Sequence, residues 1–471
     1  MKRAHFVGIA GVGMSATALL LRESGWQITG SDEGSYPPVS DYLARAGITV
    51  RTPYAAKNIP KTVDLIIIGK SAKLTNENPE VRAAHERSVP IKNFAEVLGE
   101  ILQNREPIVI AGSYGKSTAA ALMSWILIHA GKDSGYMVGA IAHDLKRTSQ
   151  LGTHRLFVIE GDEYPSGHDD PRAKFLHYHA HDLLLTSAAH DHVNIFPTHA
   201  DYLAPFRELI TSLPKHSLLV ACADDAHVLK LCAGSGRPYV TYGLTEKADW
   251  SVRDITYHEK GSSFILTHGG DTVHIETSLL GAHNVQNIVG VAALLIEKGL
   301  TTADQIAAAV KKFQGVVRRL DLKTHHSPIP VFEGFGSSYE KARTAIDAIR
   351  LHFSKRRLII FFEPHTFSWR NRAMLHWYDS VFSGVDHVCV YPPPLSGATT
   401  HAQLTHDDII TRIALSGVPV TALYSAADAF PILETLQKND VVLLLTSGHM
   451  GGLVQDIPAW LDAHYTTVTS S

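Results

Sequence analysis

Apolar and polar positions in the first hundred residues form short apolar runs that alternate with helical patterns. The apolar runs lie at 4–10, 27–29 and 63–69, and the helical patterns lie at 16–22, 79–87 and 94–102. Such alternation predicts a parallel sheet with helices on both faces. We therefore expect a Rossmann-like first domain over residues 1–104.

The pattern restarts near Pro107 with a strand at 108–110, a glycine-containing turn and a long apolar helix to about His129. Further strands are predicted at 156–160, 183–186 and 218–222, and helices at 284–298 and 302–313. Alternating positions and a Gly-Gly turn over 250–280 predict an antiparallel flap. We expect a central domain over residues 105–316 that is built like a P-loop ATPase.

The last part of the chain predicts one more α/β domain, over residues 317–471. Its expected elements are a helix at 339–353 and strands at 357–362, 387–391 and 441–445. Three domains suit a chain of 471 residues, since one domain takes about 150 residues. The predicted fold class is α/β with three domains: Rossmann-like, P-loop ATPase-like and Rossmann-like.

Composition excludes several classes of protein. Hydrophobic residues make up 45% and charged residues 19% of the chain, as in ordinary globular proteins. Every apolar run is far shorter than the ~20 residues of a membrane span, so no membrane segment is expected. A net charge of −3 gives no basic footprint for nucleic acid. Cys222, Cys232 and Cys389 have no metal or disulfide spacing, which indicates reduced thiols in the cytoplasm.

The turn Gly112-Ser113-Tyr114-Gly115-Lys116-Ser117-Thr118 has the chemistry of a phosphate-binding loop. Its glycines let backbone N–H groups surround an anion, Lys116 adds charge, and Ser117 suits a Mg²⁺ ion. The loop is shorter than the usual G-x₄-G-K-[ST]. A chance Gly-Lys-Ser-Thr turn is the alternative, but the expected strand before it and helix after it favour phosphate binding.

Two polar clusters follow neighbouring strands of the central domain. Glu160-Gly161-Asp162-Glu163 ends one predicted strand, and His190-Asp191-His192 follows another. Carboxyl ends of parallel strands are where α/β proteins bind ligands, and a carboxylate there suits a hard cation beside phosphates. A solvated acidic turn and a structural histidine pair are the alternatives.

The N-terminal segment Gly8-Ile9-Ala10-Gly11-Val12-Gly13-Met14-Ser15 is a second glycine loop. With Asp32 at the end of the next strand it fits a dinucleotide fingerprint, which would make the protein an NAD-dependent enzyme. The same geometry places any diphosphate on a helix N-terminus, so UDP fits equally well.

Several segments in order along the chain resemble the motifs of the Mur ligase family. The loop at 112–118 resembles G-T-x-G-K-[ST]-[ST], 160–163 resembles E-[AG]-D-E, and Asp191-His192 resembles D-H. Gly281-Ala282-His283-Asn284-Val285-Gln286-Asn287 is similar to G-x-H-N-x-x-N, and Arg318-Arg319-Leu320 is similar to R-R-[FL]. Five motifs in this order make the resemblance specific to the family, whereas a single match would not.

The resemblance implies an ATP-dependent, ADP-forming ligase of peptidoglycan metabolism that uses ATP and Mg²⁺ and makes an amide bond through an acyl phosphate. It implies an ATP site of Gly112, Ser113, Gly115, Lys116, Ser117, Thr118, His283, Asn284, Asn287 and Arg319. The implied metal ligands are Ser117, Glu160 and His192. The implied catalytic residues are Lys116, Glu160, His192 and Arg319.

The N-terminal loop resembles the branch of the family that binds UDP-N-acetylmuramate. The residues implied for that ligand are Gly11, Gly13, Met14, Ser15 and Asp32. Asp170-Pro171-Arg172-Ala173-Lys174-Phe175-Leu176-His177-Tyr178 is similar to D-x-R-x-K-F-x-H-Y of the murein tripeptide ligases. This similarity favours the peptide L-Ala-γ-D-Glu-meso-diaminopimelate as the amine, with Arg172, Lys174, Tyr178 and His365 as its contacts. Free L-alanine is the alternative amine, and a monomer or weak homodimer is expected.

One segment departs from the family pattern. Where the family has D-D-[FY]-[AG]-H-H-P, this chain has Glu333-Gly334-Phe335-Gly336-Ser337-Ser338-Tyr339. The second carboxylate and both histidines are replaced, and His365 or Arg370 is expected to supply part of the lost charge. Two hypotheses follow: an active ligase with weakened ATP binding, or a nucleotide-binding protein of Mur architecture that has lost catalysis.

Overall fold

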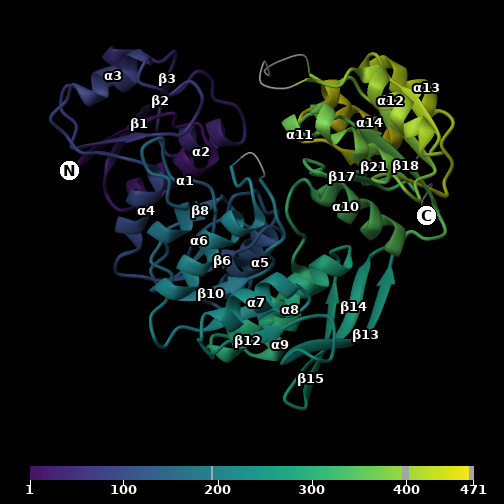
Figure 1. The fold of residues 1–471 in the computed structure, drawn as a ribbon, viewed down its shortest axis with the longest axis horizontal. Helices are drawn as coiled ribbons and strands as arrows, with labels where there is room; N and C mark the ends of the chain where they lie inside the picture. Colours follow the sequence, from purple (N-terminus) through teal and green to yellow (C-terminus); the bar gives the residue numbers. More distant parts are fainter. Residues whose placement is uncertain (193–194, 395–401, 466–471) are drawn as a thin grey trace, which may run out of the picture. The chain divides into compact units, whose positions relative to one another are not determined.

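The computed structural model describes residues 1–192, 195–394 and 402–465. Over these residues the chain forms three sheets, each with its own helices (Figure 1). Its contacts divide it into two compact units. The first unit comprises Met1–Asp254, Phe264–Glu276 and Gln286–Gln314, and the second comprises Ile255–Ser263, Thr277–Val285 and Gly315–Ser471.

The N-terminal sheet is parallel, with strand order β3-β2-β1-β4-β5. Its strands are β1 Arg3–Val7, β2 Gln27–Ser31, β3 Val50–Arg51, β4 Leu65–Ile68 and β5 Ile91–Lys92. Its helices are α1 Val12–Glu23, α2 Val39–Arg45, η1 Ala56–Asn58, α3 Pro79–His85 and α4 Phe94–Leu102. Buried apolar side chains form separate clusters on the two faces, as a doubly covered sheet requires.

The central sheet has the order β15-β14-β13-β12-β11-β10-β6-β9-β7-β8. Its strands are β6 Glu106–Ala111, β7 Gly135–Met137, β8 Ser149–Gln150, β9 Leu156–Glu160, β10 Asp182–Leu185, β11 Leu219–Cys222, β12 Val240–Tyr242, β13 Trp250–His258, β14 Gly261–His268 and β15 Asp271–Thr277. Its helices are α5 Lys116–His129, η2 Lys174–His177, α6 His199–Ser212, α7 Ala226–Gly234, α8 Ala282–Glu297 and α9 Ala303–Lys312. Strands β9, β6, β10 and β11 are parallel, so their carboxyl ends meet at one edge.

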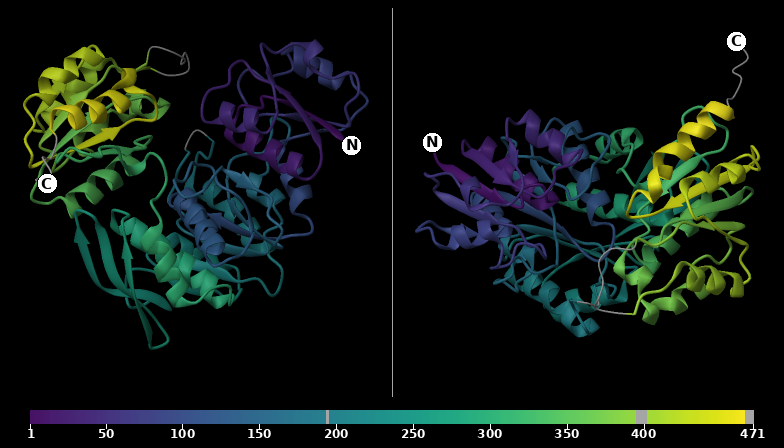
Figure 2. Two further views of the ribbon diagram at one scale, coloured as in Figure 1. Left: turned by 180° about the vertical axis from the view of Figure 1, so that it is seen from behind. Right: turned by 90° about the horizontal axis from the view of Figure 1, so that it is seen from above.

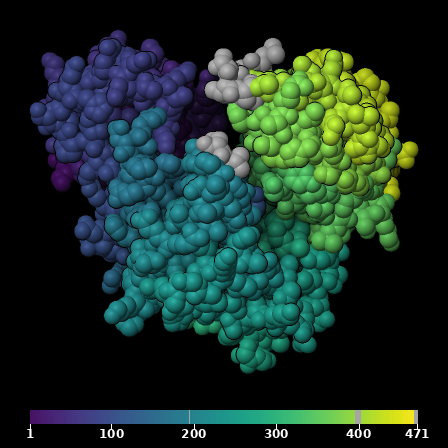
Figure 3. All heavy atoms as spheres, in the orientation of Figure 1, coloured from purple at the N-terminus to yellow at the C-terminus, as the bar shows by residue number. Residues whose placement is uncertain are grey.

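Within the first unit, the N-terminal and central sheets are joined by direct contacts. Ser149 Oγ donates to the carbonyl oxygen of Ala16 in α1, and the Leu151 N–H donates to Glu23 at the end of that helix. Helix α4 packs on η2 so closely that a Cβ at Gly99 would lie 2.3 Å from the His177 carbonyl oxygen. The surface of this unit, coloured purple to teal, is continuous in Figure 3.

The C-terminal sheet has the order β16-β17-β21-β18-β19-β20, and only its edge pair β16–β17 is antiparallel among the described strands. Its strands are β16 Arg319–Leu322, β17 Val331–Gly334, β18 Arg357–Phe362, β19 His387–Val390, β20 Val420–Ala422 and β21 Asp440–Leu445. Its helices are α10 Tyr339–His352, α11 Phe367–Arg370, η3 Arg372–Asp379, α12 His406–Leu415, η4 Ala426–Ala429, α13 Phe430–Leu433, η5 Met450–Gly452 and α14 Leu453–His464. Figure 2 shows helices on both of its faces, where the apolar core forms two clusters.

The predicted fold class is confirmed, and most predicted elements lie within two or three residues of their expected bounds. The first strand was expected to reach residue 10 but ends at Val7, because Gly8 turns the chain with a φ of 90°. Strands β3, β5, β7, β8, β12, β16, β17 and β20 were not predicted, and neither were helices α2, α6, α7 and α12. Among the described residues, no helix is long and apolar enough to cross a membrane.

Candidate functional site

The loop predicted to bind phosphate lies between β6 and α5. Gly112 has a φ of 141° and Gly115 a φ of 85°, a region that other residues adopt only with strain. There is also no room for side chains. A Cβ at Gly112 would lie 2.3 Å from Thr186 Oγ1, and a Cβ at Gly115 would lie 2.5 Å from Asn287 Oδ1. The loop therefore needs both glycines, and it lies against the predicted ATP residue Asn287.

A segment behind the loop holds it in place. The Ser113 N–H donates to the Ser187 carbonyl oxygen at 3.2 Å, and the Tyr114 N–H donates to Ser187 Oγ at 2.8 Å. Ser113 Oγ donates to the Ala189 carbonyl oxygen and accepts from the Tyr202 hydroxyl at 2.8 Å. These bonds fix the loop before any ligand arrives, which is the preorganisation that phosphate binding requires.

Lys116 at the start of α5 is paired with a buried carboxylate. Its Nζ lies 3.1 Å from Glu163 Oε2 and also contacts the Gly112 carbonyl oxygen. Burial opposes the charge of Lys116, but Glu163 and Glu160 outweigh it and raise its pKa. Burial likewise opposes the charge of Glu163, whereas Lys116 and His192 lower its pKa to about 2. Both groups are therefore charged at neutral pH.

The predicted metal ligands lie around the same loop. Ser117 Oγ donates to Glu160 Oε1 at 2.9 Å, and the other oxygen of Glu160 accepts from the Gly139 N–H at 2.8 Å. His192 has its Nε2 3.4 Å from Glu163 Oε1 and its Nδ1 3.0 Å from the Tyr164 hydroxyl.

Among the described residues, no group of three or more histidines, cysteines or carboxylates could hold a metal ion alone. A hydroxyl, a carboxylate and an imidazole beside a phosphate loop suit Mg²⁺, because this ion keeps waters and takes phosphate oxygens as further ligands.

A cavity of about 400 Å³ joins this loop to the N-terminal glycine loop. The described residues that line it come from both domains of the first unit: Val12, Gly13, Phe94, Lys116, Met137, Gly139, Glu160, Asp162, Glu163, Tyr164, Lys174, Tyr178 and His192. Charged groups of the phosphate loop and of the acidic turn thus face the start of α1 across one space.

The N-terminal loop is braced by Asp32. Its carboxylate accepts from the Ala10 N–H at 2.9 Å and from the Tyr54 hydroxyl at 3.2 Å. Burial, with the charge and the hydrogen bond of Asp32, raises the pKa of Tyr54. In the structure the side chain of Asp32 holds the loop, and its contact with UDP stays a prediction.

The Met14 and Ser15 side chains are buried in the domain, as is usual at the inner face of a helix. What these two residues offer a ligand is their backbone at the start of α1, near Gly11 and Gly13. The first N–H groups of a helix bind anions, which fits the predicted diphosphate.

The predicted peptide-binding segment divides between two places. Lys174 lines the cavity, with its Nζ 2.6 Å from Asp162 Oδ2 and its ammonium 5.5 Å from the centre of the Phe94 ring. Tyr178 also lines the cavity and is otherwise packed in the core. Arg172 is exposed and makes a bidentate pair with Asp170, at 3.0 and 2.9 Å. The structure therefore brings Lys174 and Tyr178 to the cavity and leaves Arg172 on the surface.

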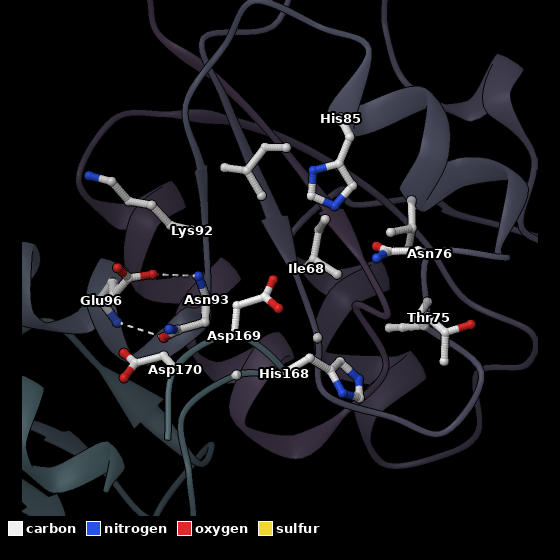
Figure 4. Close-up of a pocket in the computed structure, with 15 residues that line it drawn as sticks. Ile68, Thr75, Asn76, His85, Lys92, Asn93, Glu96, His168, Asp169 and Asp170 are labelled. Atoms are coloured by element: carbon white, nitrogen blue, oxygen red, sulfur yellow. Dashed lines mark hydrogen bonds between the residues drawn. The ribbon is translucent and has the colours of Figure 1, made fainter. Parts of the chain in front are cut away.

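A second cavity of about 420 Å³ lies between the ends of β4 and β5 and the loop 167–170 (Figure 4). Its floor includes Ile68 and its rim includes Asn76, His85 and Asp169, whose side chains turn toward it in Figure 4. The sequence had no motif for this cavity, because its walls come from five separate segments.

Three of the predicted ATP residues lie in the second unit. At the start of α8, His283 has its pKa lowered to about 4 by burial and by the charges of Arg319 and His352. Asn284 is buried and donates to the Leu280 carbonyl oxygen at 2.8 Å. The structure thus groups His283 with Arg319, whereas Asn287 of the same motif lies at the phosphate loop.

The altered segment at 333–339 has its own ion pairs and ring contacts. Glu333 is buried and lies 2.8 Å from Arg318 Nε and 3.4 Å from Lys323 Nζ. The guanidinium groups of Arg318 and Arg319 lie 5.2 and 5.1 Å from the centre of the Phe335 ring. Three cations thus lie against Glu333 and Phe335 of the altered segment.

The two residues expected to compensate have defined partners. His365 Nδ1 lies 3.2 Å from Ser447 Oγ, beside the carboxyl ends of β18 and β21. Arg370 is buried and donates to the carbonyl oxygens of Pro394, at 3.0 Å, and Thr366.

The sequence did not identify three residues of the site. Glu163 and Tyr164 follow Glu160 in the acidic turn and contact Lys116 and His192, so their signal was their place in that turn. Tyr202 contacts Ser113 from α6, 89 residues away, and no local pattern marks it.

A phosphate loop, a carboxylate and an imidazole at one sheet edge, next to a second glycine loop, define a nucleotide-dependent enzyme of the P-loop class. Residues 3–106 match the model of the Mur ligase family, catalytic domain, and residues 110–295 match that of the Mur ligase middle domain. The chain belongs to the Mur ligase family, whose members are ATP-dependent, ADP-forming amide-bond ligases.

Individual proteins support this assignment. The chain is 28% identical to a UDP-N-acetylmuramate–L-alanine ligase of Psychrobacter cryohalolentis, over 97% of this chain and 94% of the relative. The structure of a UDP-N-acetylmuramate–alanine ligase from Thermotoga maritima aligns with a TM-score of 0.78 and 22% identity, over 99% and 98% of the two chains. A murein peptide ligase from Psychrobacter arcticus aligns with a TM-score of 0.70 and 23% identity, over 99% and 100%. The two structures confirm the three-domain fold, whereas the boundaries at 104 and 316 stay predictions.

Proposed function

We propose that the protein joins the lactyl carboxylate of UDP-N-acetylmuramate to an amine with the use of ATP. The observation that carries this proposal is the cavity shared by the two glycine loops. A diphosphate on the N-terminus of α1 would direct its sugar toward Lys116 and Glu160, where a carboxylate would meet the phosphate to be transferred. An NAD-dependent reaction has less support, because the side chain of Asp32 is engaged with its own loop.

Residues of the first unit would supply most of the phosphate chemistry. Lys116 and the N–H groups of residues 112–118 would hold the β- and γ-phosphates, with Asn287 beside them. Ser117 and Glu160 would hold one Mg²⁺ and His192 a second. The ions, when bound, would neutralise charge on the phosphates and on the carboxylate. Tyr164 would fix the orientation of the His192 ring through its Nδ1, since a ligating imidazole commonly uses its second nitrogen in this way.

The reaction would proceed in two displacements. A carboxylate oxygen attacks the γ-phosphorus, the bond to ADP breaks, and an acyl phosphate forms. The amine nitrogen then attacks the acyl carbon, inorganic phosphate leaves and the nitrogen loses a proton. In both steps the protein acts mainly by positioning the reactants and neutralising their charge. The ion pair between Lys116 and Glu163 would therefore determine how efficiently the reaction proceeds. We also propose that His283, Asn284 and Arg319 of the second unit contact ATP.

For the amine we favour the peptide L-Ala-γ-D-Glu-meso-diaminopimelate. Support comes from the segment 170–178, which places Lys174 and Tyr178 on the cavity. Arg172 and His365 remain proposed contacts. Free L-alanine is the second candidate, and the similarity to a UDP-N-acetylmuramate–L-alanine ligase over nearly the whole chain favours it.

Release of ADP with each UDP-sugar and amine tests the proposal. UDP-N-acetylmuramate and UDP-N-acetylglucosamine are each combined with L-alanine, the tripeptide or no amine. We expect turnover only with the muramyl nucleotide, because UDP-N-acetylglucosamine lacks the lactyl carboxylate. The amine that gives the faster release of ADP, either the tripeptide or L-alanine, is identified as the substrate. ATP binding without turnover in any combination would instead favour the catalytically impaired protein.

A further inference from the structure

Helices α6 and α7 of the first unit, both labelled in Figure 1, line a groove on its surface. The α6 residues on it, His199, Leu203, Arg207 and Thr211, are four apart and therefore share one helix face. The α7 residues His227, Lys230, Leu231 and Gly234 share one face in the same way. The two faces enclose about 600 Å³, more than either cavity described above.

The lining of this groove is basic. Arg207, Lys230, His199 and His227 all border it, and no aspartate or glutamate is among the described residues that line it. Two acidic side chains at the starts of these helices are engaged in caps: Asp201 closes the capping box of α6, and Asp225 caps the first turn of α7. Leu203 and Leu231 give the floor an apolar part. Cations over an apolar floor form the complement of an anion that also carries an apolar group.

The groove is separate from the catalytic cavity but is linked to the phosphate loop. His199 donates from Nε2 to the Ala188 carbonyl oxygen at 2.8 Å, and Asp225 accepts from the Ala188 N–H at 2.8 Å. Both helices are thus bonded to one residue of the segment that anchors Ser113. Tyr202, on the inner face of α6, also donates a hydrogen bond from its hydroxyl to Ser113 Oγ.

We propose that the α6–α7 groove is a second anion site, which binds a phosphate-bearing ligand such as a nucleotide or an inorganic polyphosphate. Arg207 of α6 and Lys230 of α7 both line the groove, so each helix would supply one cation to the phosphates. The site does not use Lys116 or any residue of the loop 112–118. A ligand there would therefore bind in addition to ATP rather than in competition with it.

Calorimetry on the full chain tests the site, with pyrophosphate and ADP as separate probes. The starting protein is Lys116→Ala, which weakens the catalytic phosphate site. Into it we introduce Arg207→Gln with Lys230→Gln, or the matched pair Lys215→Gln with Lys247→Gln, which removes the same charge from exposed lysines outside the groove. Each lost charged contact is worth about tenfold in affinity. We expect a site that the groove pair weakens roughly a hundredfold and the control pair leaves unchanged.

The relative affinities for the two probes identify the kind of ligand that the site takes. ADP binding tighter than pyrophosphate at this site would identify a nucleotide, and equal binding would identify the phosphates alone; both support the site. Binding that the groove pair leaves unchanged, or that both pairs weaken equally, would overturn it. In an otherwise native chain the groove pair should keep normal ligase turnover, which shows that it is folded and that the site is distinct from the proposed active site.

Discussion

Replacing Gly115 with alanine tests the phosphate loop at a point where the backbone leaves no space. The added Cβ would lie 2.5 Å from Asn287 Oδ1, against ordinary contacts of 3.4–4 Å, so the loop or Asn287 must move by close to an ångström. The φ of 85° adds strain of roughly 1–2 kcal/mol for any residue other than glycine. A misplacement of about 1 Å in a positioned site costs up to about a hundredfold in rate.

Gly131 offers a matched control. It follows the other end of the same helix with a φ of 76°, and a Cβ there would meet nothing within 4 Å. Gly131→Ala should therefore lose a similar amount of stability through backbone strain, about 1 kcal/mol, and keep its KM for ATP. Gly115→Ala should lose stability and also show a ten- to hundredfold lower kcat/KM for ATP.

ADP release at varied ATP, together with thermal unfolding, separates these effects. The double variant Gly115→Ala with Asn287→Ala no longer has the overlap between the Cβ and the Asn287 side chain, but it also lacks a proposed ATP contact. We therefore expect it to recover only part of the lost kcat/KM for ATP. If Gly115→Ala and Gly131→Ala have the same kcat/KM for ATP, then the loop does not hold the nucleotide phosphates, and the reasoning from its geometry fails.

Three further predictions concern the charged groups around this loop. Lys116→Ala should abolish ATP turnover and leave the far-UV circular dichroism spectrum unchanged; amide formation near the wild-type rate would contradict the loop assignment. Glu160→Ala and His192→Ala should each raise the Mg²⁺ concentration needed for half-maximal rate, which unchanged titrations would disprove. Glu163 has its pKa lowered to about 2 from 4.5, so its pairing stabilises the fold above pH 4.5 and is lost as pH falls toward 2. The wild-type protein should therefore unfold at a higher urea concentration than Glu163→Gln at pH 7, and the difference between their urea midpoints should be smaller at pH 3. A difference that does not change with pH would contradict the ion pair.

Local patterns were sufficient for the elements whose signals are strong. Helix α4 begins and ends as predicted, since Asn93 and Glu96 form a capping box before an apolar run. Strands β9 and β18 also match, because each is a buried run with polar residues at its ends. Strand β17 was missed because Glu333 and Gly334 interrupt its apolar pattern, and its place depends on pairing with β21, more than a hundred residues later.

The candidate site was predictable where a motif fixes its own geometry. The loop 112–118 and Glu160 needed only a strand and a helix in the right order. Asp32 was different, because its role as a brace depends on Ala10 and Tyr54, which no spacing rule connects to it. The helix containing His283 and Asn287 shows the same limit. Residues four apart share a helix face, yet one lies with Arg319 and the other at Gly115.

Buried charges around the phosphate loop bear on whether catalysis survives the altered segment at 333–339. Glu163 is 1% exposed and Lys116 14%, and both carry charge. A buried ion pair contributes little net stability, and apolar residues in its place often stabilise a fold more. A chain that no longer used ATP would gain by replacing such a pair. Retention of Lys116, Glu163 and His192 in one hydrogen-bonded group therefore argues for a working phosphate site. We therefore expect the changes at 333–339, in a unit where Arg318 and Arg319 still contact the Phe335 ring, to weaken ATP binding without removing it.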